Sequence, residues 1–293
     1  MSFLPHLFLG LLEGAVAAAT LALTALGLSL VFGVMRVVNV AHGEFFMLGA
    51  MIAWWSGRLL HASPLAGFLL GLVCAPLAVG ALAFLTERLV LRRVNYNPEA
   101  TIVATIGLLF VIQQAALSLF GAEAKPVPAP FYLRVAFPWF GYSGYKLFFV
   151  VASVTLLLVA WWVVSRTRVG LVMRATQIDQ EIATAFGVPV GRVYSAVFVA
   201  GAMIAALAAV LVAPILQAHY LMGMNPLLMS FVVVILGGLG SLKGTIVAAL
   251  VVGMAGGVIS VFFSPTLASI LATLLVAVVL LVRPEGLYGT KSR

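Results

Sequence analysis

The chain has 293 residues, of which 64% are hydrophobic and 8% are charged. Soluble domains carry about 45–50% apolar and about 25% charged residues, so this composition excludes a soluble globular protein, and its hydrophobicity excludes a disordered chain. A single cysteine, Cys74, excludes a disulfide scaffold. The net charge of +8 comes from basic residues that lie between apolar segments, which points to membrane topology and not to nucleic acid. The sequence therefore predicts an all-α, polytopic membrane protein.

Charge-free apolar runs of about 20 residues are long enough to cross a membrane as helices. The segment at the N-terminus carries no Lys or Arg, and we expect it to begin the first span instead of forming a signal peptide. With one interrupted segment after Arg36, we expect eight to nine membrane helices, some of them broken or re-entrant. The charge-free runs are 14–35, 64–86, 101–120, 147–164, 193–216, 227–242 and 244–282, the last being long enough for two spans.

The distribution of Lys and Arg predicts the orientation, because these residues accumulate in cytoplasmic loops. If the spans alternate, about 12 of the 16 basic residues fall on one side of the membrane. We therefore expect the N-terminus outside and the C-terminus in the cytoplasm. The residues on the predicted cytoplasmic side are Arg36, Arg88, Arg92, Arg93, Arg166, Arg168, Arg174, Arg192, Lys243, Arg283, Lys291 and Arg293.

The segment after the first span does not fit a simple membrane helix. Only 13 residues separate Glu44 from Arg58, which is too few to cross about 30 Å of hydrocarbon. A complete span would place Asn39, His42 and Glu44 at membrane depth. Polar groups are unfavourable there, so we expect them to face the protein interior or a water-filled cavity, with the helix broken near residues 41–43.

A second short segment, 227–242, ends in the glycine-rich sequence GGLGSLKG. The chain resumes similarly after the two interruptions, as HGEFF and KGTIV, and such pairs of short segments indicate a transporter site in an internal repeat. Alternatively, the glycines only allow close helix packing, which is the role we expect for Gly67, Gly71, Gly253 and Gly257. The glycines of the second interruption are Gly237, Gly238, Gly240 and Gly244.

The loop 166–192 is the most polar stretch of the chain and has no Gly or Pro between residues 173 and 186. Its apolar residues recur every three or four positions, which predicts one amphipathic helix over 173–186, ended by Gly187 and Pro189. The apolar stripe, formed by Ile178, Ile182, Ala185 and Phe186, must pack either on the protein's own helix ends or on a partner.

Motifs of catalytic and metal chemistry do not occur in the sequence. The chain has no GxxxxGK[ST] loop, so we expect it to hydrolyse no ATP and to be no enzyme. No HExxH or CxxC spacing occurs, so we expect neither a metal site nor a cofactor in this chain. The apolar spans are nearly free of ionisable residues, which disfavours an ion-coupled carrier.

Four stretches resemble the permeases of branched-chain amino acid ABC importers, of the LivH type. They are GLSLVFGVMRVVNVAHGEFFMLGA (27–50), residues 167–214, residues 224–253 and the tail RPEGLYG (283–289). The resemblance implies a single permease domain over 1–293, with a cytoplasmic coupling loop at 166–192, in the bacterial inner membrane. It also implies four kinds of partner: a LivM-like second permease, two cytoplasmic ATP-binding subunits, a periplasmic solute-binding protein and the lipid membrane.

The resemblance also implies roles for individual residues. Importers of this class carry an EAA-xxx-G motif in the coupling loop, and Glu181 to Gly187 has that spacing, with Ile182 in place of the usual Ala and without the downstream Leu-Pro. The implied ATPase-coupling helix contains Asp179, Gln180, Glu181, Ala183, Thr184, Phe186 and Gly187. The candidates for lining the translocation pathway are Asn39, His42, Gly43, Glu44, Gly237, Gly238, Gly240 and Gly244.

Several alternatives remain open at this stage. Permeases for urea, short amides or aromatic acids resemble the same family, and the permease pathway need not contain a solute site of its own. A stand-alone ion-coupled carrier has no need of a docking helix, which the EAA-like spacing in the loop indicates. A membrane-embedded enzyme would need a catalytic constellation that the sequence lacks.

Overall fold

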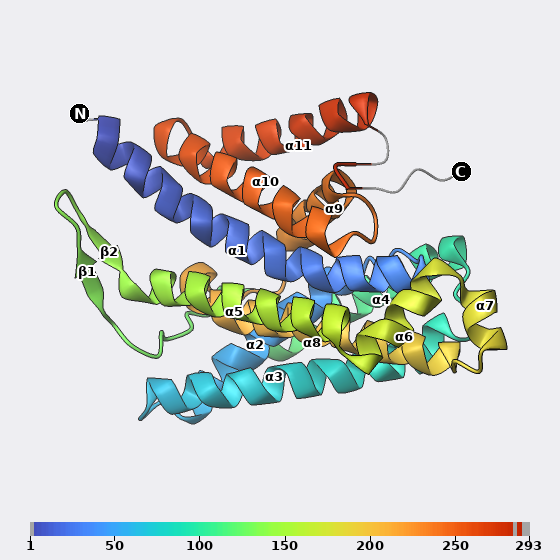
Figure 1. Cartoon of the computed structure of the whole chain (residues 1–293). Coiled ribbons are helices and arrows are strands. Elements are labelled where there is room, and N and C mark those ends of the chain that lie inside the picture. The colour runs from blue at the N-terminus through green and yellow to red at the C-terminus, as the bar shows by residue number, and fades with distance from the viewer. Residues whose placement is uncertain (1–2, 284–285, 289–293) are drawn as a thin grey trace.

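The computed structural model describes residues 3–283 and 286–288, and long apolar helices form most of it (Figure 1). In this part of the chain six helices are long and apolar enough to cross a membrane. They are α1 (Phe3–Met35), α3 (Pro64–Thr86, extended by a π-helical turn, Glu87–Leu91), α4 (Pro98–Phe120), α5 (Gly144–Arg166), α8 (Val190–Leu216) and α10 (Leu242–Phe262). Three shorter helices complete the bundle: α2 (His42–Leu59), α9 (Met224–Gly237) and α11 (Pro265–Val282). The prediction of an all-α polytopic membrane protein is confirmed.

The polar loops lie at opposite ends of the bundle (Figure 1). One end carries the antiparallel hairpin of β1 (Arg134–Ala136) and β2 (Gly141–Ser143), where Phe137 packs edge-on against Phe8 of α1 at a centroid distance of 5.2 Å. The other end carries α6 (Arg168–Ile178) and α7 (Gln180–Ala185). The basic tail residues Lys291 and Arg293 lie outside the described residues.

Glycines allow α1 and α10 to touch backbone to backbone along their length. A Cβ atom on Gly14 would lie 2.9 Å from the Cα atom of Met254, and one on Gly257 would overlap the backbone of Gly14. In the α2–α3 pair, a Cβ atom on Gly67 would lie 2.8 Å from the Cα atom of Gly57. Close approach of small residues is a main source of helix association in membranes, so the packing role predicted for these glycine pairs is confirmed.

The order of elements in α1–α4 recurs in α8–α11. Both first helices end at a non-glycine residue with positive φ, Arg36 (55°) after α1 and Gln217 (63°) after α8. A non-helical segment follows in each half, and then a shorter helix, α2 or α9, begins. The first helices run in opposite directions, because Arg36 lies near Gly191 at the start of α8 whereas Glu13 lies near Leu216 at its end.

This inverted repeat differs from the pairing that the sequence suggests. In the second half of the chain, residues 217–223 take the place that residues 36–41 have in the first half. The glycine-rich segment does not take that place, so the predicted match of HGEFF with KGTIV is wrong. Residues 238–241 form a tight turn between α9 and α10, in which Gly238 and Gly240 have φ values of 100° and 79°. Glycine is favoured there because other residues rarely adopt positive φ. The interruption at 217–223 escapes notice because it contains a single glycine, Gly223.

The contact between α1 and α10 can be tested with two neighbouring glycines. We expect Gly257→Ala to destabilise the protein by about 1–3 kcal/mol, because the new methyl group overlaps the backbone of Gly14. Thermal unfolding in detergent would show this as a midpoint several degrees lower. Gly256→Ala is the matched control, since its methyl group would meet no described atom within 4 Å, and it should leave the midpoint unchanged or raise it. Equal shifts in both variants would contradict the assignment.

Candidate functional site

The chain leaves the helical conformation after Met35, where Arg36 is exposed at the α6–α7 end, and becomes helical again at His42 inside the bundle. Asn39, His42 and Glu44 are buried there, and the helix begins again at His42, as expected for a break near residues 41–43. The Asn39 side chain replaces a helical hydrogen bond, because its Oδ1 accepts from the backbone N–H of Ala41 at 3.0 Å. The break is therefore a built feature with its own polar partners.

His42 links three helices at this depth. Its Nε2 atom donates to the carbonyl oxygen of Thr24 in α1 at 3.1 Å, since a carbonyl can only accept. The hydroxyl of Thr24 in turn accepts from Ser230 Oγ of α9 at 2.9 Å. Hydrogen bonds between membrane helices of this kind contribute about 0.6–2 kcal/mol each, so the cluster holds α1, α2 and α9 together.

Glu44 places a carboxyl group in the interior of the bundle. Its Oε1 accepts from Gln113 Nε2 of α4 at 3.1 Å, whereas its Oε2 is buried and has no hydrogen-bond partner among the described residues. Leaving a buried acceptor unpaired costs about 1–3 kcal/mol, and more for a charged group. Buried polar atoms are usually paired, so an unpaired Oε2 needs a structural or functional explanation. One explanation is that this oxygen accepts a hydrogen bond from a polar solute.

The N-termini of α2 and α9 meet beside this cluster. A Cβ atom on Gly43 would overlap the carbonyl oxygen of Gly223, and one on Gly223 would overlap that of Gly43, so both positions require glycine. From this crossing α2 runs toward the hairpin end, where Gly57 approaches Pro128, and α9 runs toward the α6–α7 end. Two half-helices that start at mid-depth and diverge are typical of transporter sites.

The structure does not bring the second set of glycine candidates to this crossing. Gly237 and Gly244 contact each other through their backbones at the end of α9, and Gly240 lies against Gly33 of α1. The Gln177 side chain of α6 donates to the carbonyl oxygen of Gly240 at 3.1 Å, which fixes this turn at the α6–α7 end. Gly238 belongs to the same turn. The predicted pathway residues thus divide between two places joined by α9.

The single helix predicted over 173–186 is wrong, because the segment forms two helices. Asp179 is extended (φ −154°, ψ 112°) and separates α6 from α7. Its Oδ1 accepts from the backbone N–H groups of Glu181 and Ile182 at 2.8 and 2.9 Å. A capping carboxylate stabilises a new helix start by about 0.5–2 kcal/mol, which favours the break over a continuous helix.

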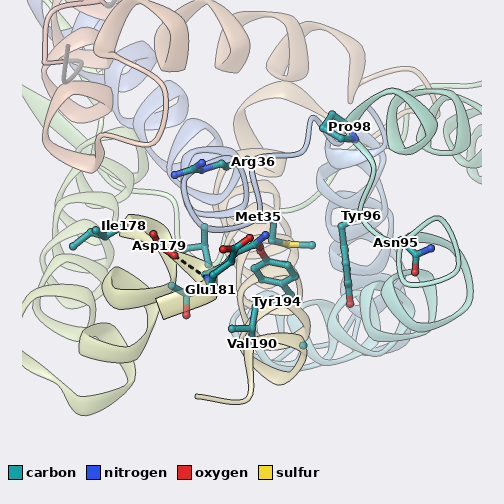
Figure 2. A pocket seen from close by; sticks show the side chains of 14 residues that line it. Met35, Arg36, Asn95, Tyr96, Pro98, Ile178, Asp179, Glu181, Val190 and Tyr194 are labelled. Atoms are coloured by element: carbon teal, nitrogen blue, oxygen red, sulfur yellow. Dashed lines mark hydrogen bonds between the residues drawn. The ribbon is translucent and has the colours of Figure 1, made fainter. Parts of the chain in front are cut away.

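A cavity of about 600 Å³ lies between α7, the end of α1, the start of α8 and the loop before α4 (Figure 2). Gln180 of α7 is tied to its wall, because Oε1 accepts from the hydroxyl of Tyr194 at 2.5 Å. Tyr194 packs edge-on against Tyr96, which donates to Glu87 Oε1 at 2.5 Å, and Ser195 donates to the other carboxylate oxygen at 2.7 Å. This chain of contacts connects the loop helices to α3 and α8.

Burial, reinforced by the Glu87 carboxylate, raises the pKa of Tyr96 above its usual range. The Tyr96 hydroxyl therefore keeps its proton and remains a donor at any physiological pH. On the other side of α6, the guanidinium of Arg36 donates to the carbonyl oxygen of Gln177 at 3.2 Å. The junction between the two loop helices is thus anchored on both sides of Asp179, at Gln177 and at Gln180.

One face of α7 and its flanks is apolar and uncovered. Ile178, Ile182 and Phe186 are 78%, 57% and 86% exposed, while Ala183 is the residue of α7 that packs inward. Gly187 ends the helix with a φ value of +81°, and Thr184 and Glu181 are exposed beside the apolar stripe. The described helix ends do not cover this stripe, so of the two alternatives for it the structure favours a partner.

Sequence reasoning missed the residues that hold the two sites in place. Glu87, Tyr96 and Tyr194 form one network, and Thr24 and Ser230 belong to the other. Their partners lie 9 to 206 positions apart in the chain, and no spacing in the sequence marks them as a group. The one available signal was Glu87, an acidic residue adjoining an apolar span.

Comparisons with known proteins agree on one family. A sequence model described as "Branched-chain amino acid transport system / permease component" matches residues 10–281. The permease protein LivH of the high-affinity branched-chain amino acid transport system of Escherichia coli K12 is 28% identical over 98% of this chain and 96% of its own length. The corresponding BraD of Pseudomonas aeruginosa is 28% identical over 97% and 96%. A probable LivH of Methanocaldococcus jannaschii is 21% identical over 95% and 92%. No solved structure matches significantly.

The capping role of Asp179 can be measured by hydrogen exchange. We expect Asp179→Ala to speed exchange of the α7 amides by about 2- to 30-fold, because the loss of a cap costs about 0.5–2 kcal/mol. Asp179→Asn is the matched control, since asparagine caps equally well and should keep exchange within about twofold of the natural chain. Unchanged exchange in the alanine variant would show that other contacts hold α7.

Proposed function

Because the chain belongs to the branched-chain amino acid transport system permease family, we propose that it forms half of the translocation pathway of an ATP-driven importer for branched-chain amino acids. The family match over residues 10–281 carries this proposal. It is supported by six helices long enough to cross a membrane and by relatives that this chain matches over 92–96% of their length.

We infer that the chain lies in the bacterial inner membrane with three kinds of protein partner: a LivM-like second permease, two cytoplasmic ATP-binding subunits and a periplasmic solute-binding protein. The uncovered stripe of Ile178, Ile182 and Phe186 supports the contact with an ATP-binding subunit, because large apolar side chains at the tip of a polar loop favour burial against another protein. The basic residues near the α6–α7 end support a cytoplasmic position for this end, with the N-terminus outside.

The anchors of the loop helices suggest how ATP hydrolysis moves the permease. Gln180 connects α7 to Tyr194 of α8, and Gln177 connects α6 to the turn after α9. Both α8 and α9 extend to the crossing at mid-depth. When the ATP-binding subunits close and displace α6 and α7, these two helices shift with them, because packed elements move between discrete arrangements.

We assign the pathway to the surroundings of the α2–α9 crossing, with Asn39, His42, Gly43 and Glu44 beside it. The turn of Gly237, Gly238, Gly240 and Gly244 lies at the cytoplasmic end of α9, where it would border the inner end of the same route. Glu44 carries a carboxylate that suits the ammonium group of an amino acid, since one of its oxygens has no described partner.

Reconstitution tests the whole proposal. The tagged chain, expressed beside its neighbouring genes and placed in liposomes, should take up leucine only with ATP and a leucine-loaded binding protein. It should also co-purify with two ATP-binding subunits and a second permease. Uptake of urea or aromatic acids in place of leucine would correct the substrate. Transport by this chain alone under an ion gradient would overturn the importer.

The docking role of the apolar stripe predicts the effect of removing its most exposed member. Phe186→Ala should weaken co-purification of the ATP-binding subunits at least tenfold, because about 1.4 kcal/mol of lost apolar contact corresponds to that factor. Phe263→Ala, which removes another highly exposed phenylalanine at the opposite end of the bundle, is the control and should have no effect. Normal assembly of the Phe186 variant would place the docking surface elsewhere.

The proposed role of Glu44 predicts that its charge matters and its volume does not. Glu44→Gln keeps an acceptor for Gln113, so the thermal midpoint should stay within about two degrees while leucine uptake falls at least tenfold. Glu99→Gln, at an exposed position in the first turn of α4, serves as the control. Full uptake by the Glu44 variant would make this residue part of the packing.

A further inference from the structure

A second cavity of about 600 Å³ opens near the hairpin end of the bundle. It lies between the first half of α1, the end of α8, the segment 217–223 and the first turns of α9. Small-molecule sites in proteins have volumes of about 300–1,000 Å³, and most are apolar with a few placed polar groups. This cavity has both properties, and none of its residues was singled out as a site by the sequence.

The walls of the cavity are mainly aliphatic. Leu21 of α1, Val212 and Ile215 of α8, and Met229 of α9 contribute to them. Such a surface favours a branched aliphatic side chain, because each buried methylene contributes about 0.8 kcal/mol. The side chains of these four residues have no nitrogen or oxygen atom that could form a hydrogen bond with urea or with a second amide group.

Four polar residues line the same cavity: Glu13, Thr20, His219 and Asn225. The Glu13 carboxylate borders the cavity, and its Oε1 also lies 2.6 Å from the ammonium group of Lys146 on α5, which does not line the cavity. A lipid acyl chain would have no use for these groups. A zwitterion with an apolar side chain would use the Glu13 carboxylate for its ammonium group, the polar side chains of His219 and Asn225 for its carboxylate, and the apolar walls.

The floor of the cavity connects to the α2–α9 crossing. The carbonyl oxygen of Thr20 accepts from the hydroxyl of Thr24 at 2.9 Å, and Thr24 is the partner of both Ser230 and His42. Met222, which also lines the cavity, directly precedes Gly223 at the crossing. A solute in the cavity would therefore rest on the residues that separate the two halves of the bundle.

The cavity in Figure 2 is its counterpart at the other end of the same helix pair. That cavity is lined by the end of α1 and the start of α8, whereas this one is lined by the start of α1 and the end of α8. Between them α1 and α8 touch, since a Cβ atom on Gly27 would lie 2.5 Å from the carbonyl oxygen of Gly201. Two cavities on opposite sides of a closed crossing suit alternating access.

We propose that this second cavity, between the first half of α1 and the end of α8, binds a single α-amino acid with an aliphatic side chain before translocation. The ammonium group would face Glu13, the carboxylate would face Asn225 and His219, and the side chain would lie against Leu21, Val212 and Met229. This assignment rests on the proposed import of amino acids and adds a solute site within the permease itself.

Cysteine accessibility tests the site directly in the reconstituted complex. In a Cys74→Ala background, Thr20→Cys and Asn225→Cys should react with a positively charged, membrane-impermeant methanethiosulfonate added from outside. Saturating leucine should slow the reaction at least fivefold. Leu158→Cys on the exposed face of α5 is the control and should not react, because a thiol facing lipid does not ionise. Lack of reaction at 20 and 225, or reaction that leucine does not slow, would overturn the proposal.

Filling the cavity tests its role in transport. Met229→Trp should raise the KM for leucine uptake at least tenfold, because the larger side chain occupies the aliphatic part of the site. Leu158→Trp, beside the natural Trp161 and Trp162, should leave uptake unchanged. Normal uptake by the Met229 variant would overturn the site while leaving the importer intact. If the natural complex takes up no leucine with ATP, the proposed function fails, and leucine protection at residues 20 and 225 still decides the site.

Discussion

Every peptide group within a membrane must find its hydrogen-bond partner in the protein, and this constraint governs the two places where the chain leaves the helix in the interior. Before α2, the N–H of Ala41 is met by Asn39 and that of Val40 by Thr105 of α4 at 3.2 Å. Before α9, Ala218 exchanges two backbone hydrogen bonds with Lys125 of the loop between α4 and β1. The partners that stabilise the breaks thus come from the break itself, from α4 and from the loop that follows α4.

The breaks determine the rest of the architecture. Because α2 and α9 start at mid-depth and run apart, α1 and α8 cross between them, and each of these two helices borders one cavity with its first part and the other cavity with its last part. The crossing requires backbone contact, which Gly43 and Gly223 permit. The two cavities therefore follow from the same inverted arrangement that places His42 and Glu44 in the interior.

Local sequence properties predict the features that depend on hydropathy and chain length. The spans, the helix start near His42 and the packing of Gly257 on α1 all follow from apolar runs, polar interruptions and glycine spacing. Features that depend on distant contacts or on capping geometry could not be predicted in this way. The apolar periodicity predicts one continuous helix where Asp179 in fact separates two helices. Gln217 adopts a positive φ although it is not glycine. The network of Glu87 with Tyr96 likewise becomes visible only when the helices are assembled.

The position of α8 explains how one displacement could act on both cavities. Its second turn carries Tyr194 and Ser195, which bind Gln180 of the loop helices and Glu87 of the π-helical turn, and its last turns line the cavity near the hairpin end. Between these ends it packs on α1, α2 and α3 through small residues, such as Ala206 against Gly49. Small residues leave no interlocking side chains to block a tilt, and a rigid helix transmits motion at one end to the other. A tilt of α8 about this contact would narrow one cavity as it widens the other, so under the proposed function a displacement of α6 and α7 would reach both cavities through α8.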